Sequence, residues 1–326
     1  MKRRLLMLGA VFVTMLLALP ALAITNPTPD NGEHPQVGQL LFYVPDAIDP
    51  RFGDGDPGSW FNCSGTVIAD KIVLTAGHCT FAVGSNGKST DPQGDPKADT
   101  NGDGMADNGT GGNDIWFTTQ ETVDYGFLPP SSTFACEGCG GNAARYATWS
   151  RALNKNRSWL RGSAHPHDLY NDLAFYLHDA GVVVLAKSSG LKRAQFGRLP
   201  ALGHLDAYFA QPRDSQRFTP VGYGLQGGFP GYEGGDTRYQ ASVMLIDQTG
   251  VAGLGSGISV LFSNDAGAAH GGGTCFGDSG GPVFDGDTTT IVAVTSFSMN
   301  QTCTGVGGGY RIDQEDDLEF IGGFLR

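Results

Sequence analysis

The feature of this chain that most constrains its fold is the shortness of its apolar runs. After residue 23 the recurring apolar segments are short, are rich in Val, Ile, Phe and Tyr, and end at Gly, Asp, Asn or Pro. Such segments are typical of β-strands joined by tight turns. Glycine supports this interpretation, because 50 of the 326 residues are Gly, about twice the usual share. The expected strands are 39–44, 65–68, 72–75, 173–177, 182–185, 240–246, 258–262, 282–284 and 291–296.

Only the C-terminal stretch has a helical pattern. Asp313 can cap a helix there, and Leu318, Ile321 and Leu325 repeat at intervals of three and four residues. No shift in composition divides the rest of the chain. We therefore predict a mostly-β protein that ends in one helix.

The first 23 residues have the pattern of a secretory signal peptide. They begin with basic residues, continue with an apolar core over 5–19, and end on the small-x-small pattern of Ala21 and Ala23. A membrane anchor is the alternative, but the apolar core is short and Pro20 interrupts it. We expect a mature protein of residues 24–326 that is secreted, soluble and monomeric, with no membrane partner.

Charge and cysteine content narrow the class further. The net charge of −12 disfavours a nucleic-acid partner, which would require basic patches. Export to an oxidising compartment makes disulfides the first interpretation of the cysteines. Six cysteines allow 15 pairings, and their spacing alone does not select one. They are Cys63, Cys79, Cys136, Cys139, Cys275 and Cys303.

Two polar segments, 46–59 and 84–114, have the composition of surface insertions. The second is acidic and contains oxygen-bearing side chains at alternate positions followed by Gly104, which is how an EF-hand-like calcium loop begins. Thr110 stands where such a loop has a bidentate glutamate, so a solvated acidic loop is the alternative. The candidate calcium ligands are Asp99, Asn101, Asp103, the Met105 carbonyl and Asp107.

The strongest chemical signal is the segment Gly277-Asp278-Ser279-Gly280-Gly281-Pro282. A nucleophilic serine requires an exposed hydroxyl, a nearby base and backbone N–H groups that can bind an oxyanion. Glycine two positions before Ser279 lets the backbone approach a substrate carbonyl. A glycine-rich turn is the alternative, and the whole hexapeptide favours the nucleophile.

A histidine and a carboxylate can complete this chemistry. The apolar run that ends in Thr75 leads to His78 and then Cys79, so a disulfide could fix the histidine loop. The carboxylate should orient the ring of His78 and stabilise its protonated form. Asp172, at the head of the expected strand 173–177, is the preferred candidate, whereas Asp168 lies in a polar stretch typical of a solvated loop.

The order His78, Asp172, Ser279, with the motifs TAGHC, NDLA and CFGDSGGP, resembles the secreted, bacterial-type members of the chymotrypsin/trypsin-like serine protease family. The resemblance implies an all-β fold of two six-stranded antiparallel β-barrels and a C-terminal helix, with a catalytic triad between the barrels. The chain departs from the family pattern at Gly77, where alanine is usual, and in the long spacing between His78 and Asp172.

The resemblance also assigns roles and disulfides. It makes the chain a serine endopeptidase acting on protein or peptide substrates through an acyl-enzyme, with no cofactor for catalysis. The N–H groups of Gly277 and Ser279 would form the oxyanion hole. The implied disulfides are Cys63–Cys79 and Cys275–Cys303, which leaves Cys136 and Cys139 to bridge each other, with a metal site as the lesser alternative.

Specificity is also inferred from the resemblance. The base of the primary pocket is Gly273, an aspartate in enzymes that cut after Lys or Arg, and its neighbours are Thr274 and Ser298. A buried cation would have no partner there, so we predict cleavage after medium or large uncharged residues. A glutamate preference is the alternative, although Thr295 stands where such enzymes usually have a histidine.

Two further expectations follow from the family. Its mature amino terminus pairs with the aspartate before the serine, and cleavage after Ala23 would leave Ile24 free to pair with Asp278. Signal-peptide removal would then activate the enzyme with no propeptide. Some proteins of this fold are calcium-binding or adhesive modules without an intact triad, which is the alternative to an enzyme.

Overall fold

The computed structural model covers residues 1–326 and describes most of the chain after residue 26. The described residues are 27–45, 47, 58–84, 111–134, 141–171, 174–208, 211–212, 216–227, 233–247, 257–265, 272–300 and 302–326. The predicted signal sequence, Ile24, Asp172, Cys136, Cys139 and the candidate calcium ligands lie outside them. No helix in the described part is long and apolar enough to cross a membrane.

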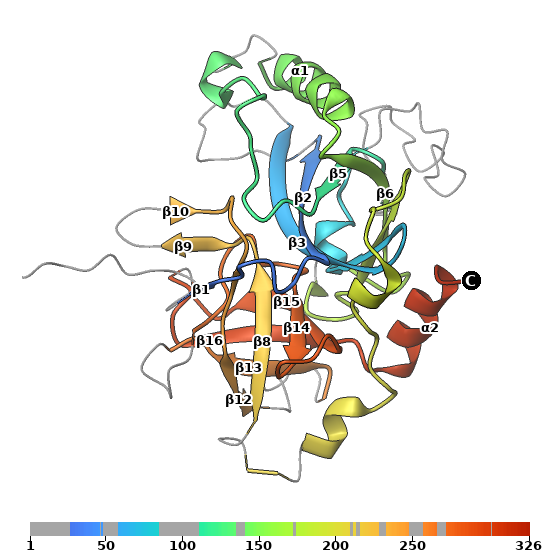
Figure 1. The fold of residues 1–326 in the computed structure, drawn as a ribbon, viewed down its shortest axis with the longest axis vertical. Coiled ribbons are helices and arrows are strands. Elements are labelled where there is room, and N and C mark those ends of the chain that lie inside the picture. The colour runs from blue at the N-terminus through green and yellow to red at the C-terminus, as the bar shows by residue number, and fades with distance from the viewer. Residues whose placement is uncertain are drawn as a thin grey trace, which may run out of the picture.

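The first half of the chain forms a closed six-stranded antiparallel barrel, the upper body in Figure 1. The strands follow one another around it in the order β2-β3-β4-β7-β6-β5, and pairing of β2 with β5 closes it. Their bounds are β2 (Val37–Val44), β3 (Ser59–Ala69), β4 (Ile72–Thr75), β5 (Ile115–Thr118), β6 (Leu160–Pro166) and β7 (Gly181–Leu185).

The second half forms another closed antiparallel barrel of six strands, below the first in Figure 1. Pairing of β8 with β14 closes it, and β11 and β1 extend the sheet from β8. Its strands are β8 (Arg217–Gly222), β12 (Val243–Asp247), β13 (Ser259–Ser263), β14 (Pro282–Asp285), β15 (Ile291–Ser298) and β16 (Val306–Arg311). The additional strands are β1 (Thr28–Pro29), β11 (Tyr239–Gln240) and the hairpin of β9 (Leu225–Gly227) and β10 (Glu233–Gly234). The predicted architecture of two barrels is confirmed.

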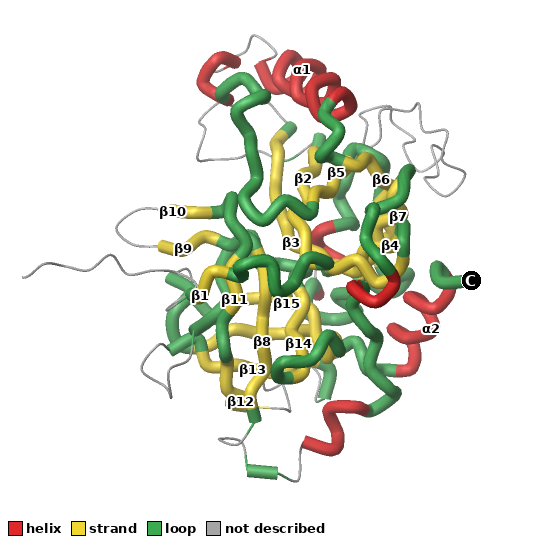
Figure 2. The backbone as a smooth tube through the Cα atoms, viewed as in Figure 1, coloured by secondary structure: helices red, strands yellow, loops and turns green. Residues whose placement is uncertain are grey.

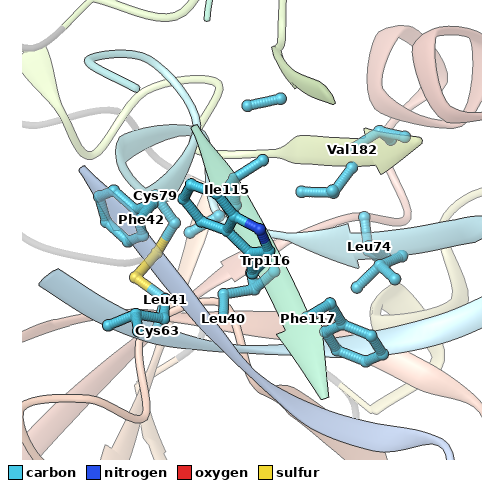
Figure 3. Close-up of a cluster of buried hydrophobic side chains, with 14 of the residues drawn as sticks. Leu40, Leu41, Phe42, Cys63, Leu74, Cys79, Ile115, Trp116, Phe117 and Val182 are labelled. Atoms are coloured by element: carbon cyan, nitrogen blue, oxygen red, sulfur yellow. A yellow bond between two sulfur atoms is a disulfide. The ribbon is translucent and has the colours of Figure 1, made fainter. Parts of the chain in front are cut away.

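Side chains inside the barrels supply most of the apolar burial. In the first barrel Leu40, Leu74, Trp116, Phe117 and Val182 are fully buried, as Figure 3 shows. Each such side chain contributes about 1.5–3 kcal/mol through its removal from water. The second barrel has its own cluster of buried side chains, which includes Phe218, Val243, Leu245, Val260 and Phe262.

One predicted strand is wrong. Residues 174–177 form a turn in which Ala174 N–H donates to the Asn171 carbonyl (3.0 Å) and Leu177 N–H to the Ala174 carbonyl (2.8 Å). Phe175 is exposed and makes an edge contact with Phe297, with ring centroids 6.4 Å apart. The apolar residues of this stretch therefore line a surface, and the buried strand is β7, four residues further on.

Two α-helices flank the barrels, coloured red in Figure 2. The predicted terminal helix is confirmed as α2 (Glu315–Gly323), but Asp313 does not cap it. Instead the Asp313 carboxylate accepts hydrogen bonds from Arg311 and the Leu205 N–H. The short 3₁₀ helices are η1 (Gly77–Cys79), η2 (Ser131–Phe134), η4 (Arg193–Gln195) and η5 (His204–Tyr208).

The sequence-based prediction missed the helix α1 (Gly141–Lys155), which lies at the end of the first barrel far from α2 (Figure 1). It is largely polar, so its overall pattern is weak. Tyr146, Trp149 and Leu153 nevertheless recur at intervals of three and four residues and pack toward the barrel. That spacing was the available signal.

Candidate active site

His78 lies where β4 leaves the first barrel. The chain enters the helical turn η1, in which the Thr80 hydroxyl donates to the Gly77 carbonyl (2.8 Å). The predicted Cys63–Cys79 disulfide is present and ties this turn to β3 (Figure 3). A Cβ on Gly77 would lie 2.7 Å from the ring of Tyr170, so that ring occupies the space of the alanine that is usual in the family.

The carboxylate that contacts His78 is Asp179. The Nδ1 of His78 lies 3.0 Å from Oδ2 and 3.1 Å from Oδ1, and the His78 backbone N–H donates to Oδ1 (2.9 Å). Because a carboxylate only accepts, the proton of neutral His78 is on Nδ1, which leaves the lone pair of Nε2 free to act as a base.

Asp179 takes the position that the sequence analysis assigned to Asp172, and this corrects that assignment. Asp172 lies outside the described residues, and the alternative, Asp168, is exposed. Asp179 is buried, two residues before β7, whose residues 181–184 pair with β4. Since β4 leads directly to His78, this pairing brings the two side chains together.

A serine in the second barrel completes the surroundings of Asp179. The Ser296 hydroxyl in β15 donates to Asp179 Oδ2 (2.5 Å), so the carboxylate accepts from both barrels. Burial by itself lowers the pKa of His78, but the charge and hydrogen bonds of Asp179 outweigh it and raise that pKa. The arrangement therefore stabilises the protonated form that a general base acquires.

Ser279 sits in a turn pressed against the histidine strand. The Ser64 N–H in β3 donates to the Ser279 carbonyl (2.8 Å). A Cβ on Gly280 would lie 2.0 Å from the Thr75 Oγ1 and 2.7 Å from the Ala76 nitrogen, so only glycine allows this approach. Ser279 is thereby held beside the residues that lead into His78.

The backbone before Ser279 is arranged to present N–H groups. Gly277 has φ of +98°, a conformation that favours glycine, and its carbonyl accepts from the Ser64 hydroxyl (2.8 Å). Among the described residues, neither the Gly277 nor the Ser279 N–H donates to a protein acceptor. Both donors remain available for an oxyanion.

Asp278 points away from this surface into the second barrel. Its carboxylate accepts from the Gly224 N–H (2.8 Å) and the Cys275 N–H (2.9 Å). Burial raises its pKa to about 7, and these two hydrogen bonds only partly oppose the rise. The second predicted disulfide, Cys275–Cys303, is also present and holds this loop.

A small cavity of about 230 Å³ opens beside Ser279, and none of its described lining residues is charged. Gly273 lies behind it, and a Cβ there would fall 2.4 Å from Cβ of Asn264, so the side chain of Asn264 fills the space an aspartate at 273 would need. The Asn264 amide donates to the carbonyls of Thr274 and Cys303 and its oxygen accepts from the Thr274 N–H. The cavity is lined by Thr274, Cys275, Phe276, Ser279, Thr295, Ser296, Phe297 and Ser298.

These features together match one family. The family model for trypsin matches residues 138–313, more than half of the chain. The chain belongs to the trypsin family. The matched region includes Asp179 and Ser279, and the fold brings His78 to Asp179 from outside it.

Solved structures show the same fold in other proteins. HL collagenase is 16% identical, with 94% of this chain and 96% of that chain covered and a TM-score of 0.55. Human heparin binding protein is 14% identical, with coverages of 92% and 95% and a TM-score of 0.52. A search of curated proteins found no match. At these identities the likeness establishes the trypsin-family fold alone.

One group of side chains in this trypsin-family chain resembles a metal site. Donor atoms of His167, His178 and Asp316 lie within 4.8 Å of one another. However, the Leu169 N–H donates to His167 Nδ1 (3.1 Å), so the neutral ring carries its proton on Nε2 and has no free lone pair for a metal. A second group, Cys63, His78 and Cys79, has its sulfur atoms in a disulfide.

Three site residues were missed by the sequence analysis. Asp179 had a signal, because it lies two residues before Gly181–Leu185, a run richer in β-branched residues than the one after Asp172. Ser296 was predicted only as the last residue of the expected strand 291–296. Asn264 carried no signal, because it reaches the pocket base only through pairing of β13 with β16.

Proposed function

We propose that the chain is a secreted serine endopeptidase that hydrolyses peptide bonds through His78, Asp179 and Ser279. The observation that supports this most strongly is the Asp179 carboxylate, which accepts from both the Nδ1 and the backbone N–H of His78. A buried, uncharged role for a histidine would not require a carboxylate at this position. Ser279 would supply the nucleophile, and the N–H groups of Gly277 and Ser279 would supply the oxyanion hole.

The reaction proceeds through an acyl-enzyme. Nε2 of His78 takes the proton of Ser279 Oγ as that oxygen attacks the substrate carbonyl. The N–H groups of Gly277 and Ser279 bind the oxyanion that forms, a contribution of about 10²–10³ in rate for each donor. The protonated His78, stabilised by Asp179, then gives its proton to the leaving amine, and water releases the acyl group by the reverse steps.

The enzyme hypothesis has a direct test. A fluorophosphonate probe should label the mature protein once, at Ser279, and labelling should vanish in Ser279→Ala and fall strongly in His78→Ala. Casein or a quenched peptide library should be cleaved in parallel. The alternative function is a calcium-binding or adhesive module with at most vestigial activity. It predicts a folded protein that is neither labelled nor cleaves substrate above a trace, and that result would overturn the proposal.

For primary specificity we propose a medium or large uncharged side chain, not Lys or Arg. The pocket is small, no charged group lines its described part, and the side chain of Asn264 fills the space that an aspartate at position 273 would need. A peptide library with Ser279→Ala as control tests this, and dominant cleavage after Lys or Arg would contradict it. Asn264→Ala should enlarge the accepted side chain.

A glutamate preference is the alternative within the same fold. The Thr295 hydroxyl is buried beside the pocket and has no hydrogen-bond partner among the described residues. It offers a substrate carboxylate one donor but no positive charge. The same library separates the two, because a glutamate-specific enzyme would leave apolar residues uncut, and Thr295→Val would then abolish its activity.

We propose that the amino terminus freed by signal-peptide removal activates the enzyme by pairing with Asp278. Thr28 pairs with Gln240 in β11, and β11 pairs with β8. A Cβ on Gly222 at the end of β8 would lie 2.3 Å from Asp278 Oδ1. Two strand spacings separate β1 from β8, about 10 Å, and the four residues from Ile24 to Thr28 can span about 13 Å. Ile24 is therefore within reach.

A buried ion-pair cluster holds β1 in position for this pairing. Asp30 and Arg238 are both buried, and Nε of Arg238 donates to Asp30 Oδ2 (2.8 Å). The same guanidinium donates to the Val37 carbonyl (2.9 Å) and the Tyr223 hydroxyl (3.2 Å). The start of the mature chain is thus fastened to both barrels close to Asp278.

Calcium binding by the loop 99–107 stays a proposal supported by its alternating oxygen ligands. Excess calcium should raise the melting temperature and protect the loop from proteolysis, relative to protein treated with a chelator. An unchanged melting curve would favour a solvated acidic loop.

A further inference from the structure

Asp179 lies in a tight turn, and the residue before it has a backbone conformation that is unfavourable for most side chains. The Ala180 N–H donates to the His178 carbonyl (2.7 Å), which makes Asp179 the middle residue of this turn. His178 has φ of +51°, in the left-handed region, which costs free energy for a residue with a Cβ. Contacts of the His178 side chain must therefore favour this conformation for it to persist.

Two elements of the fold hold the ring of His178. On one face it stacks on His167, the residue after β6, with ring centroids 5.0 Å apart and ring planes inclined by 16°. At its edge, Nδ1 lies 3.1 Å from Oδ2 of Asp316 in the first turn of α2. The ring is thus wedged between the first barrel and the C-terminal helix, and rotation of the backbone at residue 178 would withdraw it from both.

The stacking partner has a fixed position of its own. The His167 N–H donates to the Ala180 carbonyl (2.9 Å), and the Leu169 N–H donates to Nδ1 of His167 (3.1 Å). Phe320 of α2 packs on the same ring, with ring centroids 4.9 Å apart. Burial and the neighbouring His178 lower the pKa of His167, so this ring is neutral at pH 7 and does not repel a protonated His178.

The helix that carries Asp316 is anchored to the second barrel. The Tyr310 hydroxyl in β16 donates to the carboxyl group of Asp317, with distances of 2.9 Å and 3.1 Å to its two oxygens. Ile321, one turn further along α2, is fully buried. Since Asp316 directly precedes Asp317, the second barrel fixes where the Asp316 carboxylate meets His178.

The contacts of Asp179 tolerate little displacement of its carboxylate. Oδ1 accepts from the His78 backbone N–H (2.9 Å), and Oδ2 accepts from the Ser296 hydroxyl (2.5 Å). Both oxygens also lie within 3.1 Å of the His78 Nδ1. A change in the backbone at residue 178 would tilt the carboxylate and lengthen at least one of these contacts.

We propose that His178 is a positioning residue whose ring, held between the first barrel and α2, keeps its own backbone left-handed. The Asp179 carboxylate thereby stays in contact with His78. The inference rests on the proposed protease function, in which Asp179 orients the base. It assigns no contact with substrate to His178, which acts only through the turn that it begins. The C-terminal helix is thus connected to the candidate active site through the contact between Asp316 and His178.

The pKa of His78 reports where the Asp179 carboxylate lies, because the charge and hydrogen bonds of that group raise it. NMR of protein labelled with 13C-histidine measures this pKa, and the ring signal that is missing from His78→Ala identifies His78. His178→Ala should lower the pKa by about half a unit to one unit, and kcat/KM about threefold to tenfold. His178→Asn should keep both near their native values, because asparagine tolerates a positive φ. Only the signals of folded protein are followed, so a loss of stability does not mimic the shift.

The contact with α2 is tested from its other side. Glu315→Ala is the matched control for Asp316→Ala, because it removes an exposed acid from the same turn of the helix. Relative to this control, Asp316→Ala should lower the pKa of His78 in the native protein but not in His178→Asn, which needs no ring contact to stay left-handed. Equal shifts in the two helix variants, or in His178→Ala and His178→Asn, would overturn the inference.

This measurement separates the inference from the protease function, because a titration of His78 requires no cleavage of substrate. If the native protein cleaves peptides and the pKa of His78 is unchanged in His178→Ala, the inference alone is overturned. If no peptide is cleaved, the protease function fails, and the same pattern of pKa values still supports or overturns the positioning role of His178.

Discussion

Two buried carboxylates lie on either side of the candidate nucleophile, and they differ in what surrounds them. Asp179 accepts hydrogen bonds from His78 and from the Ser296 hydroxyl. Asp278 accepts only from two backbone N–H groups, and burial raises its pKa to about 7. The first carboxylate has its partners in the described chain, whereas the second lacks a cation there.

The difference indicates how the site is put together. A buried charge without a partner is costly, so Asp278 needs a positive group, and the proposed one is the Ile24 ammonium. Asp179 needs none, because His78 and Ser296 already stabilise its charge. His78 and Asp179 are thus held together by the folded barrels, whereas we propose that the loop of Gly277 and Ser279 depends on a freed amino terminus.

The largest expected effect follows from replacing the acid beside His78. Asp179→Asn should lower kcat about 10⁴-fold, the loss known for the equivalent residue of this family's triad, because an amide favours the wrong tautomer of the histidine. Kinetics on a quenched peptide measure it. Asp172→Asn should change kcat less than threefold, and equal losses in both variants would contradict the assignment to Asp179.

The second effect tests the cation of Asp278. Two extra residues ahead of Ile24, or Asp278→Asn, should each lower kcat/KM about 10²–10³-fold, because the oxyanion donors lose their support. The amino terminus of each protein is verified by mass. A protein with both changes should lose little more kcat/KM than a protein with either change alone, because both changes remove the same proposed ion pair between the amino terminus and Asp278.

Full activity in the extended protein, with the extension intact, would show that the amino terminus does not pair with Asp278. Another cation near Asp278 would then have to stabilise the charge of this buried carboxylate. A mature form that begins elsewhere than Ile24 would lead to the same conclusion.

A smaller effect is expected at the second partner of Asp179. Ser296→Ala removes one hydrogen bond to a charged group, which corresponds to about tenfold in kcat. Because Asp179 keeps both contacts with His78, the loss should stay far below that of Asp179→Asn. A loss as large as that of Asp179→Asn would mean that Ser296 has a further role in the pocket.

The smallest effect is a pH dependence of stability. Without a cation the folded-state pKa of Asp278 lies near 7, above its ordinary 3.8, so its ionisation destabilises the protein as pH rises from about 4 to 7. The form that begins at Ile24 should therefore melt several degrees above the extended form at pH 8. The gap should narrow as pH falls from 7 towards 4, because Asp278 of the extended form then takes up a proton and no longer carries an unpaired buried charge. A constant gap would exclude Asp278 as its cause.

Much of this protein could be predicted from its sequence, because local patterns carried the information. Short apolar runs bounded by turn residues predicted most strands, including β4 over its full length. The segments around Ser279 and His78 have backbones that only particular residues allow, such as Gly277 and Gly280 with positive φ. The resemblance paired four cysteines correctly.

The remainder depended on contacts between distant segments. Asp172 and Asp179 both precede an apolar run, and the sequence does not say which run pairs with β4. Only the β4–β7 pairing places Asp179 against His78, 101 residues away. The helix α1 was missed for a similar reason: its stability comes from packing of Trp149 and Tyr146 on the barrel rather than from its own pattern.

The sequence by itself, through motifs that resemble the trypsin family, thus predicted the two-barrel fold and two disulfides, which the structure confirms, and it pointed to Ser279 and His78 as the candidate nucleophile and base. Only the tertiary structure decided which acid contacts His78 and that the side chain of Asn264 fills the space beside Gly273. These features arise where strands and loops distant in sequence meet, and the geometry of closing a barrel, not any local pattern, sets which residues meet there.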